Sequence, residues 1–298
     1  MEYHEPVMLD ESVEGLNIRP EGIYVDVTFG GGGHSREILS CLGEKGKLIG
    51  FDQDPDAAKN APHDERFFLV QANFRFLSRY LRYLGVEKVD GILADLGVSS
   101  HQIDLPEKGF SHRFSGPLDM RMNSGVKQTA ESLLKECDKR ELQEVFSKYG
   151  EVRNSKTLAE RIVKARDTMP LKTTADFVEM IGDLVRGPRS RYLSMVFQAL
   201  RIAVNEELKA LEEVLEQSGA HLKVGGRLSV ISYHSLEDRI VKNFIRSGNT
   251  SGRIDKDEYG VVQTPFKKVT KKPITPTAGE IQRNPRSRSA KLRIAERL

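Results

Sequence analysis

The first 95 residues alternate between strand and helix patterns, and this alternation restricts the fold more than any other feature of the chain. Apolar, β-branched strand patterns occupy residues 24–27, 47–52, 67–70 and 88–95. Helical patterns follow at residues 35–42, from Pro55 onward and at residues 77–84. Alternating units of this length predict an α/β fold, with a doubly wound, mostly parallel sheet and helices on both faces.

Four consecutive glycines, residues 30–33, interrupt the first strand-to-helix connection. Glycine loses more conformational freedom on folding than any other residue, so four together indicate a tight turn or close backbone approach to a ligand. A Gly-x-Gly-x-x-Gly fingerprint does not fit, because its third glycine would fall on Ser35 or Arg36, and the Lys-Ser/Thr ending of a P-loop is missing. The alternative is a left-handed turn and helix cap without a ligand, although one glycine normally suffices for a cap.

Two carboxylates next to this loop favour a cationic ligand. Asp26 lies within the first strand pattern, close to the loop, where it would repel a phosphate. Asp52 ends the second, where a ribose diol would need an acceptor. S-adenosylmethionine has both a sulfonium charge and a ribose. The parallel sheet would bring the glycine loop, Asp52 and Asp95 to the same edge, so one common cofactor site is expected there.

Composition restricts the class of protein. At 298 residues, with 38% hydrophobic and 30% charged residues, the chain suits one large domain plus an insertion. No apolar run approaches the roughly 20 residues that span a bilayer, and the acidic first residues do not resemble a signal peptide. We therefore expect a cytoplasmic protein without a membrane partner. Cys41 and Cys137 are isolated and the histidines scattered, so neither a disulfide nor a metal site is expected.

The pattern changes after Asp95. Helical patterns without an intervening strand occupy residues 129–149, 155–166 and 173–185. A long helix over residues 193–217 is expected to lead back to a strand at 226–233, and residues 256–277 are expected to form an extended loop beside the site. We therefore predict a core from residues 1–104 and 193–298, and a helical insertion at 105–192 that recognises the substrate.

The positive charge is concentrated in the tail. Ten Lys and Arg from Lys267 onward face only Glu280 and Glu296, a net +8, so the whole-chain charge of +3 leaves −5 for residues 1–266. Such a segment suits a polyanion, because each phosphate that is neutralised releases counterions. The alternative is a solvated, partly disordered tail.

Two further motifs hold polar groups suited to chemistry. In the glycine-rich loop of residues 95–122, Asp95 could contact the cofactor or accept a hydrogen bond from a substrate amine, and Gln102 could hold a base edge. After the returning strand, Tyr233 could stack on a base and His234 could deprotonate an amine. Ser235, with Asp238 three residues later, could cap a helix. The alternatives are local hydrogen bonding in a turn and a buried structural histidine.

Six ordered blocks of sequence together resemble the bacterial 16S ribosomal RNA cytosine-N4 methyltransferases (RsmH, formerly MraW). The blocks are residues 30–34, 95–104, 109–122, 197–207, 232–239 and 284–289. The resemblance runs nearly end to end and is loosest in the helical insertion. It implies a class I methyltransferase core, S-adenosylmethionine as the methyl donor, and methylation of a cytidine in the decoding region, with 16S rRNA or the small subunit as partner. Monomer and homodimer both stay open.

The same resemblance implies roles for individual residues. The cofactor contacts would be Gly32, Gly33, His34, Asp52, Phe74, Asp95 and Gln102, with Phe76 as the alternative to Phe74. Catalysis would depend on positioning the amine in line with the methyl group and on accepting its hydrogen, for which Asp95 ranks first and His234 second. The target base would be unstacked into the pocket. The charge of the tail and the aromatic ring of Tyr233 separately predict RNA contacts at Tyr233, Arg286, Arg288, Lys291 and Arg293.

Two rival functions stay open from the sequence. A methyltransferase for a small molecule or a protein would share the cofactor site but would not need the basic tail. An RNA-binding assembly factor could retain the fold without turnover.

Overall fold

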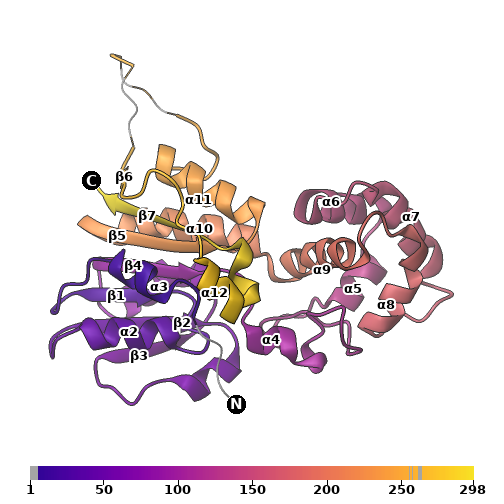
Figure 1. Ribbon diagram of the computed structural model, residues 1–298, viewed down its shortest axis with the longest axis horizontal. Coiled ribbons are helices and arrows are strands. Elements are labelled where there is room, and N and C mark those ends of the chain that lie inside the picture. Colours follow the sequence, from indigo (N-terminus) through magenta and orange to yellow (C-terminus); the bar gives the residue numbers. More distant parts are fainter. Residues whose placement is uncertain (1–5, 255, 257, 261–263) are drawn as a thin grey trace. The chain divides into compact units, whose positions relative to one another are not determined.

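The computed structural model describes residues 6–254, 256, 258–260 and 264–298. The chain forms two compact units (Figure 1). We call Met1–Gly97 with Leu208–Leu298 the sheet unit, and Val98–Glu207 the helical unit. Among the described residues, no helix is long and apolar enough to cross a membrane.

The sheet unit contains seven strands among its described residues, in the order β3-β2-β1-β4-β5-β7-β6. Strands β1 to β5 are parallel, β7 is antiparallel to β5, and β6 is antiparallel to β7. The predicted doubly wound α/β fold is confirmed. The bounds are β1 Ile23–Asp26, β2 Lys47–Asp52, β3 Phe67–Gln71, β4 Val89–Asp95, β5 Leu222–Ser232, β6 Phe266–Lys268 and β7 Lys291–Arg297.

Helices cover both faces of this sheet. Apolar residues of α1 and α2 pack on one face, and those of α3, α10 and α11 pack on the other. The bounds are α1 Leu9–Glu14, α2 Gly33–Cys41, α3 Leu77–Tyr83, α10 Glu207–His221, α11 Ser235–Ser247 and α12 Ala278–Arg283, with 3₁₀ turns at Pro55–Asn60, Phe74–Phe76 and Pro285–Ser289. The helix expected from Pro55 is one of these 3₁₀ turns, because Ala57 is its only buried residue and no apolar stripe extends it.

The helical unit has its own core of apolar side chains. Its helices are α4 Ser100–Asp104, α5 Ala130–Glu136, α6 Lys139–Gly150, α7 Ser155–Ala165, α8 Thr174–Met180 and α9 Arg189–Asn205, with 3₁₀ turns at Pro106–Lys108 and Gly182–Leu184. The helical pattern at residues 129–149 is divided between two helices. The break follows from Asp138, whose side chain accepts from the Glu141 N–H and caps α6.

The unit boundaries differ from those expected. The helical unit spans residues 98–207 rather than 105–192. The single helix expected over residues 193–217 is two helices, because Glu206 has a left-handed backbone (φ 49°) that ends α9. Phe197 of α9 lies in the core of the helical unit, and Leu211 of α10 lies in the core of the sheet unit. α9 therefore packs in the core of the helical unit, and α10 packs in the core of the sheet unit.

The basic tail is part of the sheet. Leu292, Ile294 and Ala295 of β7 are buried, and β7 pairs with β5 over six residues. A disordered tail is therefore wrong for residues 291–297, which form β7. Within the loop expected at residues 256–277, β6 forms a short edge strand, and residues 257 and 261–263 lie outside the described part.

Candidate cofactor site

Three aspartates lie at one edge of the sheet. Asp26, Asp52 and Asp95 end β1, β2 and β4, which are neighbouring parallel strands, so their carboxyl ends lie together. The segment after β1 is fixed on both sides, since the Val27 N–H donates to the Leu93 carbonyl and the Phe29 N–H to the Phe51 carbonyl, at 2.9 and 2.8 Å. Ligands of open α/β sheets bind at such an edge, where the strand order reverses.

The glycine loop presents bare backbone at this edge. Gly30 and Gly32 have φ of 51° and 75°, a region that side chains disfavour. A Cβ at Gly30 would meet nothing closer than the Thr28 carbonyl at 3.9 Å, so the loop is open there to a ligand. Glycine is required at position 33 for a different reason, because a Cβ there would collide with the ring of Pro6. The loop therefore combines a ligand cradle with close packing of the chain on itself.

Asp26 stabilises the loop from inside. Its carboxylate is buried and accepts hydrogen bonds from Ser35 Oγ at 2.7 Å and from the Thr28 N–H at 3.0 Å. Burial raises its pKa, and the charge of His34 opposes that shift. The expected direct attraction of a cation is thus replaced by a structural role, because the carboxylate faces its own loop.

Asp52 joins two turns at the end of β2. Its Oδ2 accepts from the Gly30 N–H and its Oδ1 from the Asp54 N–H, both at 2.8 Å. Each carboxylate oxygen has a second lone pair, so Asp52 can still accept from a ribose diol. Burial raises its pKa to about 6, although both backbone hydrogen bonds lower it.

Asp95 is held by groups from three other elements. The Tyr233 hydroxyl donates to Oδ1 at 2.7 Å, His34 Nδ1 lies 3.9 Å from Oδ2, and the Asp95 N–H donates to Thr28 Oγ1 at 2.6 Å. Burial raises the Asp95 pKa to about 6, while His34 and Tyr233 lower it. The carboxyl side chain is 22% exposed, so it can still reach a ligand.

His34 lies between Asp95 and the N-terminal segment. Its ring is buried, and Nε2 lies 3.1 Å from the Val7 carbonyl oxygen. A carbonyl oxygen only accepts, so this contact places a proton on Nε2. Nδ1 of the same ring faces Asp95 Oδ2 at 3.9 Å, which is beyond hydrogen-bonding distance.

Tyr233 is not placed as expected. Its ring packs against a small apolar cluster that includes Ile231 and Leu292, and its hydroxyl is used by Asp95. Burial beside Asp95 raises the Tyr233 pKa well above 10. The geometry gives this side chain a bracing role, and its stacking on a base stays a prediction.

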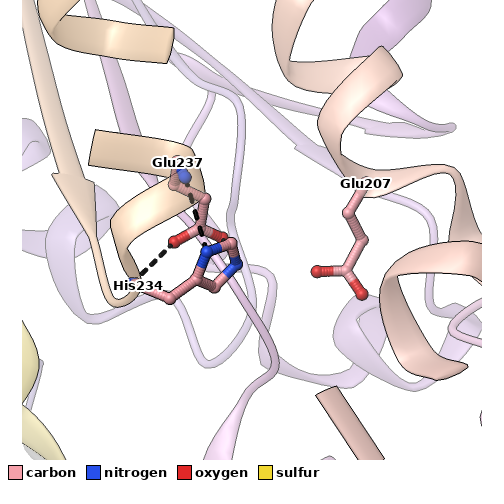
Figure 2. Close-up of side chains that lie close together, drawn as sticks. All are labelled: Glu207, His234 and Glu237. Carbon is pink, nitrogen blue, oxygen red and sulfur yellow. Dashed lines mark hydrogen bonds and ion pairs between the residues drawn. The ribbon is translucent and has the colours of Figure 1, made fainter. Parts of the chain in front are cut away.

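His234 caps helix α11, a role predicted from the sequence for Ser235. Its Nδ1 accepts from the Glu237 N–H at 3.4 Å, and Glu237 Oε2 accepts from the N–H groups of Tyr233 and His234 at 2.8 and 3.3 Å. Figure 2 shows the imidazole ring beside the Glu237 carboxylate. The capping box therefore starts one residue earlier than predicted. Glu237 was missed because histidine is not among the residues preferred at this position.

The two remaining cofactor candidates lie in different units. Phe74 packs partly buried against the core of the sheet unit, whereas Phe76 is 46% exposed. Gln102 lies in α4 of the helical unit, where it is buried. Its side-chain Oε1 accepts from the backbone N–H of Ser99, and its backbone N–H donates to Ser99 Oγ, both at 3.2 Å. This capping box already uses part of the hydrogen-bonding capacity of Gln102.

The tail cations divide into two groups. Lys291 and Arg293 lie on β7 and face Asp238 of α11, with Nζ to Oδ2 at 3.5 Å and Arg293 Nε to Oδ1 at 2.7 Å. These two cations therefore face a carboxylate of the same chain, and their assignment as RNA contacts stays a prediction. Arg288 is exposed, and Arg286 is half-buried.

Comparison with known proteins decides the family. A sequence model described as the MraW methylase family matches residues 1–298. The chain belongs to the MraW methylase family. A protein of Cytophaga hutchinsonii named Ribosomal RNA small subunit methyltransferase H is 57% identical over 298 residues, covering 99% of each chain. Proteins of the same name from Parabacteroides distasonis and Flavobacterium johnsoniae are 55% and 54% identical, each covering at least 98% of both chains.

Membership of the MraW methylase family makes this chain an S-adenosylmethionine-dependent methyltransferase. The residues present fit that cofactor. The loop is open at Gly30, and Asp52 and Asp95 supply carboxylates at the same edge for a ligand that has hydroxyl groups and a positive charge.

Proposed function

We propose that this enzyme methylates the exocyclic N4 amine of a cytidine in the decoding region of 16S rRNA. The observation that supports this substrate most strongly is the full-length identity of 57% to a protein named Ribosomal RNA small subunit methyltransferase H. The partner is then 16S rRNA or the small ribosomal subunit, and the place of action is the cytoplasm. Family membership favours an active methylase over an assembly factor without turnover. The name shared by the relatives favours ribosomal RNA over a small molecule or a protein as the substrate.

In this proposal the cofactor lies against the glycine loop. Gly32 and Gly33 approach it through backbone, and Asp52 accepts from the ribose. Asp95, at the end of β4, and His34, in α2, are proposed as further contacts. Phe74 and Gln102 are proposed as contacts of its base. When bound, S-adenosylmethionine supplies a methyl group on a positively charged sulfur. The open surface at Gly30 supports this placement.

Asp95 is proposed to accept the hydrogen of the substrate amine. A cytosine amine is a weak nucleophile because its lone pair is conjugated with the ring, so orientation by an acceptor contributes directly to the rate. The Tyr233 hydrogen bond fixes Oδ1 of Asp95, and the partly exposed carboxyl group can accept through its other lone pairs.

His234 is less suited to that task. Its Nδ1 accepts from the Glu237 N–H, so in the neutral ring the proton lies on Nε2. No ring nitrogen then has a lone pair available for a substrate hydrogen while the cap is intact. We propose that His234 positions α11, and through the preceding residue Tyr233, the carboxylate of Asp95.

The test supplies purified enzyme with S-adenosylmethionine that has a radiolabelled methyl group, together with undermethylated small subunits, naked 16S rRNA, or bulk cellular protein. Label in N4-methylcytidine after nuclease digestion is expected with one of the two RNA substrates. D95A should lose most of this label. Label in protein would contradict the proposal, as would methylation at another position of the base.

A further inference from the structure

Four exposed arginines of the helical unit lie at or near the beginning of α9. Arg186, Arg189 and Arg191 lie within six residues of each other, and Arg113 comes from the segment between α4 and α5. The charges of Arg113 and Arg189 both act on the ring of His112, lowering its pKa after the larger effect of burial, so the two segments lie close together.

The ring of His112 joins these segments. It lies edge-on to Phe197 of α9, with ring centres 5.7 Å apart, and its Nε2 is 3.4 Å from Ser194 Oγ. The backbone beside the arginines is open, since a Cβ at Gly187 would have no atom within 4 Å. Phe114, next to Arg113 in sequence, is 45% exposed. The arginine surface, as we call Arg113, Phe114, Arg186, Arg189 and Arg191, thus combines positive charge with an accessible aromatic ring.

No carboxylate of the described residues forms an ion pair with these four arginines. The nearby exposed carboxylate of Asp183 is bound by Arg161, through two hydrogen bonds of 2.7 and 2.6 Å. On α6 of the same unit, three cations have acidic partners: Arg140 and Lys148 pair with Glu144, and Lys139 pairs with Glu160. An uncompensated group of four charges is costly by mutual repulsion unless a polyanion binds there.

We propose that the arginine surface binds the phosphate backbone of the RNA substrate, with Phe114 stacking on an unpaired base. Guanidinium groups match phosphate oxygens in pairs, and an exposed ring beside them is typical of single-stranded RNA recognition. This inference rests on the proposed function, because it gives that substrate a second contact region at a stated place in the helical unit.

The test uses the full-length enzyme and 16S rRNA transcript, with affinity measured over a range of salt concentrations. R186Q/R189Q/R191Q removes three charges from the arginine surface, and K139Q/R140Q/K148Q removes three charges from α6 of the same unit as the matched control. The first variant should bind RNA at least tenfold more weakly at low salt, and its slope of log affinity against log salt should fall by about 2. The control should retain the wild-type slope.

A third variant separates stacking from charge. F114A should lower affinity about tenfold while leaving the salt slope unchanged, because stacking releases no counterions. Equal affinities and salt slopes for the two triple variants would overturn the inference. An F114A affinity equal to that of wild type would show that Phe114 does not stack on the RNA. Calorimetric S-adenosylmethionine binding should be unchanged in all three. If wild-type enzyme methylates RNA while both triple variants behave alike, the arginine surface fails and the proposed function stands. Absence of methylation by wild-type enzyme would instead contradict the function.

Discussion

The hydroxyl of Tyr233 donates a 2.7 Å hydrogen bond to Oδ1 of Asp95, across 138 positions of sequence. This contact joins the end of β4 to the segment before α11. Glu237 holds the same segment by accepting from the Tyr233 N–H at 2.8 Å. The motif that begins at Asp95 and the motif around Tyr233 are therefore joined by hydrogen bonds. Through them, α11 and its cap position the carboxylate that we propose as the amine acceptor.

Removing that hydroxyl should shift the pH dependence of cofactor binding. Asp95 has a pKa of about 6, so S-adenosylmethionine affinity should rise between pH 5 and 7 as the carboxylate ionises and attracts the cation. Y233F removes a donor that favours the ionised form. The midpoint should move up by about one pH unit, since a hydrogen bond to a charged group contributes about 1.5 kcal/mol and one unit is roughly 1.4 kcal/mol.

Calorimetric titration across this pH range measures the midpoint. His34, Asp26 and Glu237 also act on Asp95, and Y233F leaves all three in place. Y24F is the matched control, because the buried Tyr24 hydroxyl accepts from the Arg19 N–H and does not contact Asp95. Identical midpoints for Y233F, Y24F and wild type would show that the hydroxyl does not tune Asp95.

The unliganded enzyme should show the opposite pH trend in its stability. Burial raises the Asp95 pKa from about 4 in the unfolded chain to about 6, so its favourable contribution is complete below pH 4 and is lost as pH rises through 6. Relative to D95N, wild type should lose about 2 to 3 kcal/mol of unfolding free energy between pH 4 and 7. Urea unfolding at both pH values measures this difference, and a constant difference would contradict a raised pKa.

His234 should respond to substitution as a helix cap. H234N keeps a side-chain acceptor at this position and should retain both stability and methyl transfer within a few-fold. H234A should lose about 1 kcal/mol of unfolding free energy. A loss of turnover by more than a hundredfold in H234N, with stability unchanged, would instead identify His234 as the acceptor and displace Asp95.

Substitutions of two tail arginines should have different effects, because Arg293 is paired with Asp238 and Arg288 is exposed. R293Q breaks a two-bonded contact with Asp238 whose side chains are 17% and 15% exposed, and it should cost about 1 to 3 kcal/mol of unfolding free energy. R288Q changes an exposed side chain. It should leave stability unchanged and reduce the salt slope of RNA affinity by about 1 if Arg288 contacts a phosphate. A reduced salt slope for R293Q with no loss of stability would contradict this division and would make Arg293 an RNA contact.

The sequence predicted the sheet edge well because its signals are local. Each of β1, β2 and β4 is a short apolar run that ends in an aspartate, and parallel strands place such ends together. The glycine loop was equally clear. The need for glycine at position 33 could not be predicted, because the packing of Pro6 on Gly33 exists only in the folded chain.

The remaining differences from the sequence-based expectations have both distant and local causes. The tail appeared as a cationic segment because Arg293 and Asp238 lie 55 positions apart, and charge counts do not show pairing. Alternating burial in β7 was obscured by its basic side chains, although Leu292 and Ile294 follow the period of a strand. The break between α9 and α10 lies at Glu206, whose left-handed backbone has no glycine to signal it.

The most direct test of the account is mass spectrometry of nucleosides from the decoding region of 16S rRNA in cells of the source organism that lack this protein. Methylation at one cytidine N4 should be absent, should return with the wild-type gene, and should stay absent with a stably folded D95A protein. Unchanged N4-methylcytidine in the deletion strain would contradict the proposed substrate. Full restoration by D95A would contradict the role of the carboxylate on which the proposed mechanism depends.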